Sequence, residues 1–379
     1  MKVALVVHDF DPKVGHGRYC LELARRLASR HAVTIYANRF AADREPGWEF
    51  VRVPAWRRVS LASVFTFLVA SERLVRRGGH DIIHGQGMTC WRTDVITAHI
   101  CNVARYRIAP PSRFKARLFP LLVNPVESAF YRQRHARHVI AISRQVAGEI
   151  RECYGWQRPL SVIHHGVDSK LFRPPRDAEE RRAARARYGL ADVGWVWLFV
   201  GEAVKGLRGA IEQLPHFPSA RLLAISRSDG GEYKALALDL GVKDRFTFWG
   251  PEQEIWRAYR AADVFLYPST YDTFGMVVSE AMATGVPVVV GRDIGAAELI
   301  ENGRNGFLIR PSEPADLRGV LGRLVEDTAL GRTVGDAGLA TAKAQSWDAC
   351  AQATEQVYLS VLNAKQRFEA GGTSRSARR

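Results

Sequence analysis

Residues 263–290, DVFLYPSTYDTFGMVVSEAMATGVPVVV, constrain the fold of this chain more than any other segment. Two apolar runs, Val264 to Tyr267 and Val286 to Val290, have the length and composition of buried strands, and a Gly-containing turn and a short helix lie between them. This order predicts a strand, loop, helix and strand of a parallel sheet. The loop closes at Phe274-Gly275, so the helix that follows should present free backbone N–H groups at the carboxyl end of the first strand. Such a helix terminus suits a phosphate group.

Strand-like and helix-like segments alternate along the chain, which is typical of an α/β fold with parallel sheets. A first series runs from Val3–Val7 to Val139–Ile142, and a second begins after the charged stretch 176–187. A chain of 379 residues exceeds the usual size of one hydrophobic core, and an apolar share of 47% can fill two. We therefore expect two Rossmann-like domains, residues 1–172 and residues 173–345, with the ligand in a cleft between them.

The C-terminal part of the chain has two sections of different character. Residues 346–366 have helical spacing, and periodicity alone leaves open whether this helix packs on the first or the second domain. Residues 367–379 end in a small, polar and basic stretch, and we expect them to be a disordered tail.

The positive charge of the chain is concentrated in its N-terminal half. The net charge is +15; Met1 to Lys170 holds 27 Lys and Arg against 13 Asp and Glu (+14), which leaves 27 against 26 (+1) for the remainder. Such a surface can meet anionic lipid head groups or a phosphorylated acceptor, and it can also be a solvated basic face. Nucleic acid is a further partner that this charge allows, but the sequence has no recognition motif for it, so we expect no nucleic acid partner.

Cysteine usage and hydropathy indicate a cytosolic chain without a membrane span. The five cysteines have no zinc-like spacing, which favours a reducing compartment. The apolar run at Val3 to Val7 is too short for a secretion signal, and the run from Val59 to Ala70 is too short to span a bilayer. Any membrane contact should therefore be peripheral. The single Asp-x-Asp, Asp9-Phe10-Asp11, is better explained by loop polarity than by a metal site, so we expect no metal.

The opening segment resembles the donor-binding motif of the retaining GT-B glycosyltransferases of family 4. That motif has an acidic residue, Phe-Gly two residues later, and a Glu eight positions after the acid. Asp272, Phe274, Gly275 and Glu280 fall in this order, with Asp272 where the family usually has Glu. The resemblance implies a GT-B fold, in which the helix at 346–366 crosses back to the first domain. It also implies transfer of a sugar from a nucleotide diphosphate sugar with retention of configuration and no further cofactor.

The resemblance assigns roles to residues of the second domain. Asp272 would orient sugar hydroxyls and Glu280 would bind ribose. Lys205 and the helix amides at Gly275, Met276 and Val277 would stabilise the departing diphosphate. The family usually has an Arg where this chain has Glu202, and Arg208 is our candidate for the replacement cation.

Three residues of the first domain complete the predicted site. Gly15 and Gly17 occupy the position of a Gly-rich loop that lies beside the donor phosphate in the family, although an ordinary turn is the simpler explanation of the glycines alone. His99 follows the apolar run from Val95 to Ala98. A lone histidine is more often structural, but the resemblance implies contact with the donor sugar.

These observations together predict a metal-independent hexosyltransferase of cell-envelope glycan synthesis, with a lipid-linked or lipopolysaccharide acceptor. The basic first domain predicts a peripheral location at the inner face of the cell membrane. Two alternatives keep the fold: a nucleotide-sugar epimerase or hydrolase, and a nucleotide-binding scaffold with weakened catalysis, which Glu202 and Asp272 would explain.

Overall fold

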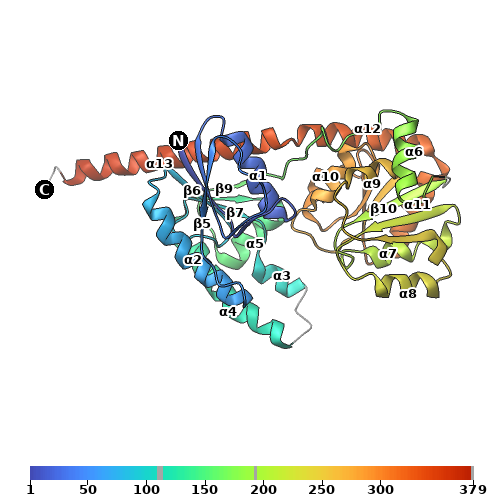
Figure 1. Ribbon diagram of the computed structural model, residues 1–379, viewed down its shortest axis with the longest axis horizontal. Coiled ribbons are helices and arrows are strands. Elements are labelled where there is room, and N and C mark those ends of the chain that lie inside the picture. Colours follow the sequence, from blue (N-terminus) through green and yellow to red (C-terminus); the bar gives the residue numbers. More distant parts are fainter. Residues whose placement is uncertain (109–113, 192–193, 377–379) are drawn as a thin grey trace. The chain divides into compact units, whose positions relative to one another are not determined.

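The computed structural model describes residues 1–108, 114–191 and 194–376, and the chain divides into two compact units (Figure 1). Unit 1 contains Met1–His165 and Trp347–Arg379, and unit 2 contains Gly166–Ser346. Each unit is built on its own parallel sheet, which confirms the two Rossmann-like domains expected from the sequence.

Unit 1 has a seven-stranded parallel sheet in the order β5-β3-β1-β6-β7-β8-β9. Its five central strands are largely buried, as strands covered on both faces must be, whereas the two edge strands are partly exposed. The strands are β1 (Lys2–Val6), β3 (Ala32–Ala37), β5 (Trp48–Arg52), β6 (Ile82–Gln86), β7 (Val95–Ala98), β8 (His138–Ala141) and β9 (Leu160–Val162). A small second sheet pairs β2 (Asp9–Phe10) with β4 (Arg39–Phe40). The helices are α1 (Gly15–Leu27), α2 (Ser60–Arg77), α3 (Asn102–Ile108), α4 (Phe114–Arg132) and α5 (Arg144–Tyr154).

Unit 2 has a six-stranded parallel sheet in the order β12-β11-β10-β13-β14-β15. Its strands are β10 (Trp195–Val200), β11 (Ala220–Ile225), β12 (Phe246–Trp249), β13 (Val264–Tyr267), β14 (Val288–Gly291) and β15 (Phe307–Ile309). The longer helices are α6 (Ala178–Arg187), α8 (Gly231–Asp239), α10 (Met276–Ala283), α11 (Pro314–Glu326) and α12 (Thr328–Ala344). The shorter helical segments are α7 (Leu207–Ile211), α9 (Trp256–Ala261), η1 (Leu214–His216), η2 (Lys243–Arg245) and η3 (Gly295–Leu299).

The strand order reverses once in each main sheet. In unit 1 the chain leaves β1 toward β3 and later returns to its other side with β6; in unit 2 it leaves β10 toward β11 and returns with β13. Because crossovers between parallel strands are right-handed, the helices on the two sides of such a point cover opposite faces. Ligands of open α/β sheets bind at the carboxyl ends of the strands at this reversal. A ligand is therefore expected at the loops after β1 and β6, or at the loops after β10 and β13.

The boundary between the units lies at residues 165 and 166, seven positions before the one expected from the sequence. Val167 N donates to Gln345 O at 2.8 Å, and the ring of Phe172 packs edge-on against Tyr259 of α9 at 5.7 Å. Both contacts join the segment after residue 165 to unit 2. They link residues far apart in sequence, and such contacts cannot be predicted from local composition.

The last helix, α13 (Trp347–Ser376), belongs to unit 1 and packs on α1, β7 and β8. Tyr358 OH lies 2.7 Å from His84 Nδ1 of β6, and Lys365 Nζ lies 2.7 Å from Asp94 Oδ1. The helix continues past residue 366, where the sequence predicted a disordered tail, to Ser376. Extending a helix that has already formed adds one hydrogen bond for each residue fixed, which makes continuation easier than initiation. Residues 377–379 of that predicted tail lie outside the described residues.

Within the described residues, none of the helices combines the length and apolar character that a membrane span needs.

Candidate active site

A lysine and an aspartate meet at the strand-order reversal of unit 2. Lys205 lies in the loop after β10, and Asp272 lies in the loop after β13. Lys205 Nζ donates to Asp272 Oδ2 at 2.6 Å, and the side chains are 32% and 11% exposed. The structure therefore brings together two of the three residues predicted to be catalytic.

The glycine at position 206 allows the loops that carry Lys205 and Asp272 to lie in contact. Gly206 has φ +104°, and a β-carbon there would lie 2.3 Å from the carbonyl oxygen of Pro268, which follows β13. A side chain at 206 would push the two loops apart, because carbon and oxygen atoms do not approach so closely without displacement. The sequence shows the Lys-Gly pair, but the partner loop is more than sixty residues away and only the fold identifies it.

Tyr267, the last residue of β13, fixes the aspartate from the core side. Its hydroxyl donates to Asp272 Oδ2 at 2.7 Å. Burial raises the pKa of Tyr267 well above its ordinary value, and the neighbouring Asp272 carboxylate adds to this shift, so the phenol keeps its proton and remains a donor. Sequence analysis treated Tyr267 only as a strand residue; its position five residues before the acid is the signal that could have identified it.

The start of α10 adjoins the pair. Gly275 precedes the helix with φ +95°, no side chain caps this helix end, and a β-carbon on Gly275 would lie 3.7 Å from Asp272 Oδ2. Phe274 is buried, whereas Gly275, Met276 and Val277 are partly exposed. The amides of the first turn therefore lie at an accessible surface beside the aspartate, where a helix carries partial positive charge.

Glu280 lies deeper, within α10. The side chain is 6% exposed, and Tyr259 OH of α9 donates to Glu280 Oε2 at 2.8 Å. This carboxylate and Asp272 are on the same short segment but have different partners. Tyr259 lies 21 residues before Glu280, and no sequence pattern predicted their contact.

Glu202, in the loop after β10, and Arg208, on α7, are both exposed. Glu202, which stands where the resemblance leads us to expect Arg, accepts a hydrogen bond from Ser228 Oγ at 3.0 Å, and Ala203 N donates to the same hydroxyl at 3.0 Å. Glu202 thus joins the loops after β10 and β11. Arg208 is 59% exposed and its guanidinium lies 3.8 Å from Glu212 on α7. Among the described residues, no hydrogen bond or ion pair joins Arg208 to Lys205 or Asp272.

In unit 1, His99 follows β7 and lies among other aromatic rings. Its Nε2 is 2.9 Å from Gln86 Oε1 at the end of β6, and its ring centroid is 5.1 Å from Tyr19, 5.6 Å from His165 and 6.1 Å from His16. Burial lowers the pKa of His99 well below its ordinary value, and the neighbouring histidines lower it further. The imidazole is therefore neutral near pH 7, able to exchange hydrogen bonds but not to act as a cation.

Gly15 and Gly17 begin α1 in the same unit. A β-carbon at Gly17 would lie 2.3 Å from Asp11 O and 2.9 Å from Asp9 O, so this glycine accommodates the chain's own loop after β1. Gly15 is the first residue of the helix. The predicted site residues thus form one group in unit 2, around Lys205 and Asp272, and one in unit 1, around His99.

Among the described residues, no group of three or more His, Cys, Asp or Glu side chains is arranged to hold a metal ion. Asp9 instead faces Arg57, whose Nη1 lies 2.5 Å from Asp9 Oδ1.

Comparison with known families gives matches over both units. The family described as "Glycosyltransferase Family 4" matches residues 14–171, and the family described as "Glycosyl transferases group 1" matches residues 194–327. A D-inositol 3-phosphate glycosyltransferase of Acidothermus cellulolyticus is 33% identical, over 91% of this chain and 85% of that protein. Relatives of the same name from Streptomyces scabiei and Streptomyces avermitilis, 30% and 31% identical over 63% and 61% of this chain, are matched over only 57% and 53% of their own length.

Solved structures show the same fold at low sequence identity. A sucrose-phosphate synthase of Thermosynechococcus elongatus has a TM-score of 0.81 at 24% identity, covering 96% of this chain and all of its own. WaaG, a glycosyltransferase involved in lipopolysaccharide biosynthesis, has a TM-score of 0.79 at 19% identity, covering 94% of this chain and 99% of its own. Anabaena HepE, solved in complex with UDP-glucose, has a TM-score of 0.73 at 20% identity, covering 95% of this chain and all of its own. With two parallel-sheet units and a relative matched along almost its full length, the chain belongs to the group 1, family 4-like glycosyltransferases of GT-B fold.

Proposed function

We propose that this protein is a retaining, metal-independent hexosyltransferase that uses a nucleotide diphosphate sugar as donor. The observation that carries the proposal is the contact of Lys205 Nζ with Asp272 Oδ2 at 2.6 Å beside the uncapped start of α10. A cation and a helix N-terminus at the strand-order reversal have the chemistry that a diphosphate requires. The nucleotide sugar is a co-substrate, and the reaction needs no other cofactor.

The proposed mechanism follows the charge that develops as the sugar leaves. Negative charge grows on the diphosphate when its bond to the anomeric carbon breaks, and Lys205 together with the amides of Gly275, Met276 and Val277 stabilises it. The departing phosphate then helps to take the acceptor proton on the same face of the sugar, which retains the configuration. Asp272 orients sugar hydroxyls, Glu280 binds ribose, and neutral His99 contacts the donor sugar.

Arg208 is the proposed second cation of the diphosphate site. Its long side chain is 59% exposed and its contact with Glu212, at 3.8 Å, is too long for a hydrogen bond. Little free energy therefore holds the guanidinium in place, and it can turn toward a bound diphosphate. Arg208→Ala should lower turnover; full activity of this variant would refute the role.

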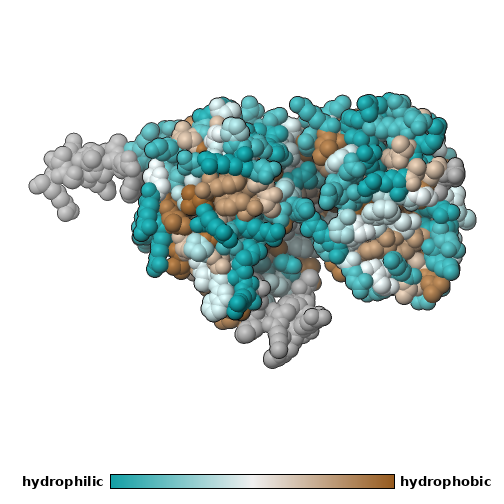
Figure 2. All heavy atoms as spheres, in the orientation of Figure 1, coloured by the Kyte–Doolittle hydropathy of each residue, from teal (hydrophilic) through white to brown (hydrophobic). Residues whose placement is uncertain are grey.

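The proposed acceptor is a lipid-linked or lipopolysaccharide molecule at the inner face of the cell membrane. The support is the charge of +14 over Met1 to Lys170, together with apolar side chains that are exposed on unit 1, among them Leu121 (71%) and Leu122 (43%) of α4 and Val69 (53%) of α2. Figure 2 shows apolar and polar residues side by side on the part of unit 1 that carries α2 and α4. Apolar insertion and basic residues together give reversible peripheral binding, which salt weakens.

A phosphorylated polyol is a second candidate acceptor. The observation that favours it is the name shared by the Acidothermus and Streptomyces relatives, which are described as D-inositol 3-phosphate glycosyltransferases. The basic first unit suits a phosphate on a small acceptor as well as one on a lipid.

One experiment tests the reaction and separates the acceptors. The purified protein is incubated with labelled UDP-, GDP- and ADP-sugars and with three acceptor classes: lipid-linked sugars, lipopolysaccharide core and inositol phosphates. We expect transfer to one class, with the anomeric configuration retained by NMR, in EDTA as well as in Mg²⁺. Loss of a sugar from the donor without any transferred product would favour a hydrolase, and an altered donor sugar would favour an epimerase. Nucleotide binding without any turnover would favour a scaffold, and activity that a chelator abolishes and a divalent ion restores would refute metal independence.

A further inference from the structure

Unit 2 contains an arginine-rich cavity that shares no residue with the Lys205 and Asp272 site. Its volume is about 450 Å³, and it lies between the segment that leads into α6, the start of α6 and the helix α9. The side chains that define its chemistry are Arg173, Arg176, Glu180, Trp256, Arg257 and Arg260.

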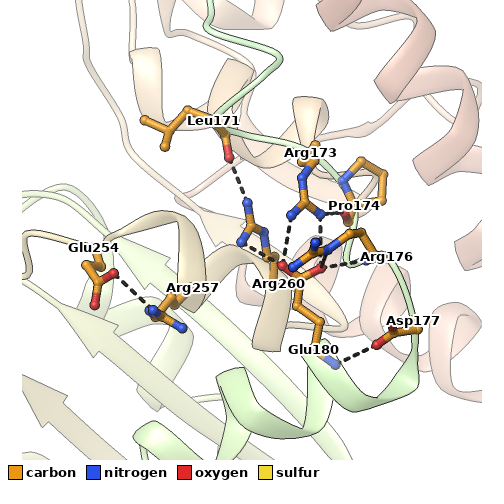
Figure 3. A network of polar contacts seen from close by, with 9 residues as sticks. All are labelled: Leu171, Arg173, Pro174, Arg176, Asp177, Glu180, Glu254, Arg257 and Arg260. Carbon is orange, nitrogen blue, oxygen red and sulfur yellow. Dashed lines mark hydrogen bonds and ion pairs between the residues drawn. The ribbon is translucent and has the colours of Figure 1, made fainter.

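Three of these arginines converge on one carboxylate, as Figure 3 shows. Arg173 donates from Nη1 and Nη2 to the two oxygens of Glu180, each at 2.9 Å. Arg260 Nη1 donates to Glu180 Oε1 at 3.1 Å, and Arg176 approaches Oε2 through Nε at 3.4 Å. A single negative charge is thus surrounded by three positive charges, and the cluster keeps a positive excess.

The other acidic residues of the cavity do not cancel this excess. Asp177 caps α6 by accepting from Glu180 N at 2.8 Å, and Glu179 pairs at 2.5 Å with Arg182, which does not line the cavity. Arg257 has its own partner, Glu254, at 3.0 Å. The N-terminus of α6, at the same place, adds further partial positive charge.

Arg260 provides an independent indication of a ligand. This side chain is 9% exposed, and its Nε is a buried donor with no acceptor among the described residues; the same holds for Nε of Arg257. A buried N–H without an acceptor costs free energy that a bound anion would recover. Arg176 (74% exposed) and Arg257 (42% exposed) remain accessible on the solvent side.

We propose that this cavity binds a phosphate-bearing anion at a site separate from the sugar donor. The planar guanidinium groups match the oxygen geometry of phosphate and can each donate two parallel hydrogen bonds. Glu180 holds Arg173 and Arg260 in position, while Arg176 and Arg257 supply the accessible donors. A dianion is favoured over a monoanion, because Arg173, Arg176 and Arg260 outnumber the carboxylates of Glu180 and Asp177.

The test measures binding of inorganic phosphate and pyrophosphate by isothermal titration calorimetry, with every variant built on Lys205→Ala to remove the proposed donor site. We expect saturable binding in Lys205→Ala itself. The added pair Arg176→Ala and Arg257→Ala should weaken it tenfold or more, since each lost charge-assisted hydrogen bond removes a large part of the affinity. Pyrophosphate should bind more tightly than phosphate.

The control is Arg304→Ala, a 74% exposed arginine of unit 2 that lies outside the cavity and pairs with Glu301, which does not line the cavity either. It should bind both anions as well as the parent does. Circular dichroism checks that the variants fold, and if the double variant does not, Arg176→Ala alone replaces it, with a weakening of several-fold expected. The proposal is overturned if Lys205→Ala abolishes all binding, or if the cavity variants bind like the control. If the proposal about the donor site is wrong, Lys205→Ala will bind UDP as tightly as the unsubstituted protein does.

Discussion

Replacing Lys205 by Met removes the charge at the proposed donor site while keeping most of the side-chain volume. Lys205 is 32% exposed and Asp272 11% exposed, so the pair lies between a surface ion pair and a buried one. Surface pairs contribute about 0.2–1 kcal/mol, and breaking a buried pair costs about 3–5 kcal/mol. Because Tyr267 still donates to Asp272 at 2.7 Å, we expect Lys205→Met to lower the free energy of unfolding by about 1–2 kcal/mol.

The effect on turnover should be much larger than the effect on stability. Loss of one group that stabilises developing negative charge typically costs about 10²–10³ in kcat. Adding Asp272→Asn removes the unpaired carboxylate, so the double variant should regain stability but not activity. Urea unfolding measures the stability, and release of nucleotide from the donor sugar measures the turnover.

A cation elsewhere in unit 2 serves as control for this prediction. Lys234 of α8 lies over the ring of Phe248, 5.8 Å from its centroid, and Lys234→Met should leave kcat within about twofold. If Lys205→Met lost stability but kept its turnover, the lysine would have a structural role only, and the reasoning about the diphosphate would be refuted.

Three further predictions concern other parts of the chain. Gly17→Ala should lower the free energy of unfolding by about 1–3 kcal/mol, because its β-carbon would lie 2.3 Å from Asp11 O. Gly148→Ala, inside α5 with open space around it, should raise the free energy of unfolding by about 0.5–1 kcal/mol. Thermal unfolding of both variants tests the contact. Burial lowers the pKa of His84 to about 3, below the ordinary value of about 6.5 in the unfolded chain, so protonation of the unfolded chain removes stability as the pH falls from about 6.5 toward 3. Between pH 7 and pH 5 this histidine should lower the free energy of unfolding by about 2 kcal/mol. If the unfolding free energy of His84→Gln depended on pH as strongly as that of the unsubstituted protein, the assignment would be wrong. Glu280→Gln should weaken binding of UDP but leave binding of inorganic pyrophosphate unchanged; calorimetry that shows equal losses for both would exclude a contact with ribose.

The sequence predicted the elements whose formation depends on local pattern. The apolar runs at Val95–Ala98 and Val264–Tyr267 have the same bounds in the structure as in the sequence analysis, because short β-branched and aromatic runs are buried as strands of parallel sheets. The helix after Gly275 was also predicted, and in the structure it begins at Met276, directly after this glycine.

Contacts between distant segments could not be predicted in the same way. The hydrogen bond from Tyr259 to Glu280 joins two helices, and the one from Ser228 to Glu202 joins two loops. Only the strand order brings these segments together. The domain boundary was placed too late for the same reason, because the packing of Phe172 on Tyr259 is a tertiary contact.

Within the candidate site, Lys205 and Asp272 could be named from the sequence but not paired. Their contact depends on the absence of a side chain at Gly206, which allows the loop after β10 to touch Pro268. Arg208 was named as a replacement for the Arg that the family resemblance expects, and its guanidinium lies 3.8 Å from Glu212 in the structure.

A crystal structure of the protein with bound UDP tests the central claim most directly. The account predicts that the diphosphate lies against Lys205 Nζ and the amides that follow Gly275, with the ribose beside Glu280. A diphosphate bound at any other place in unit 2, with these three residues untouched, would contradict it.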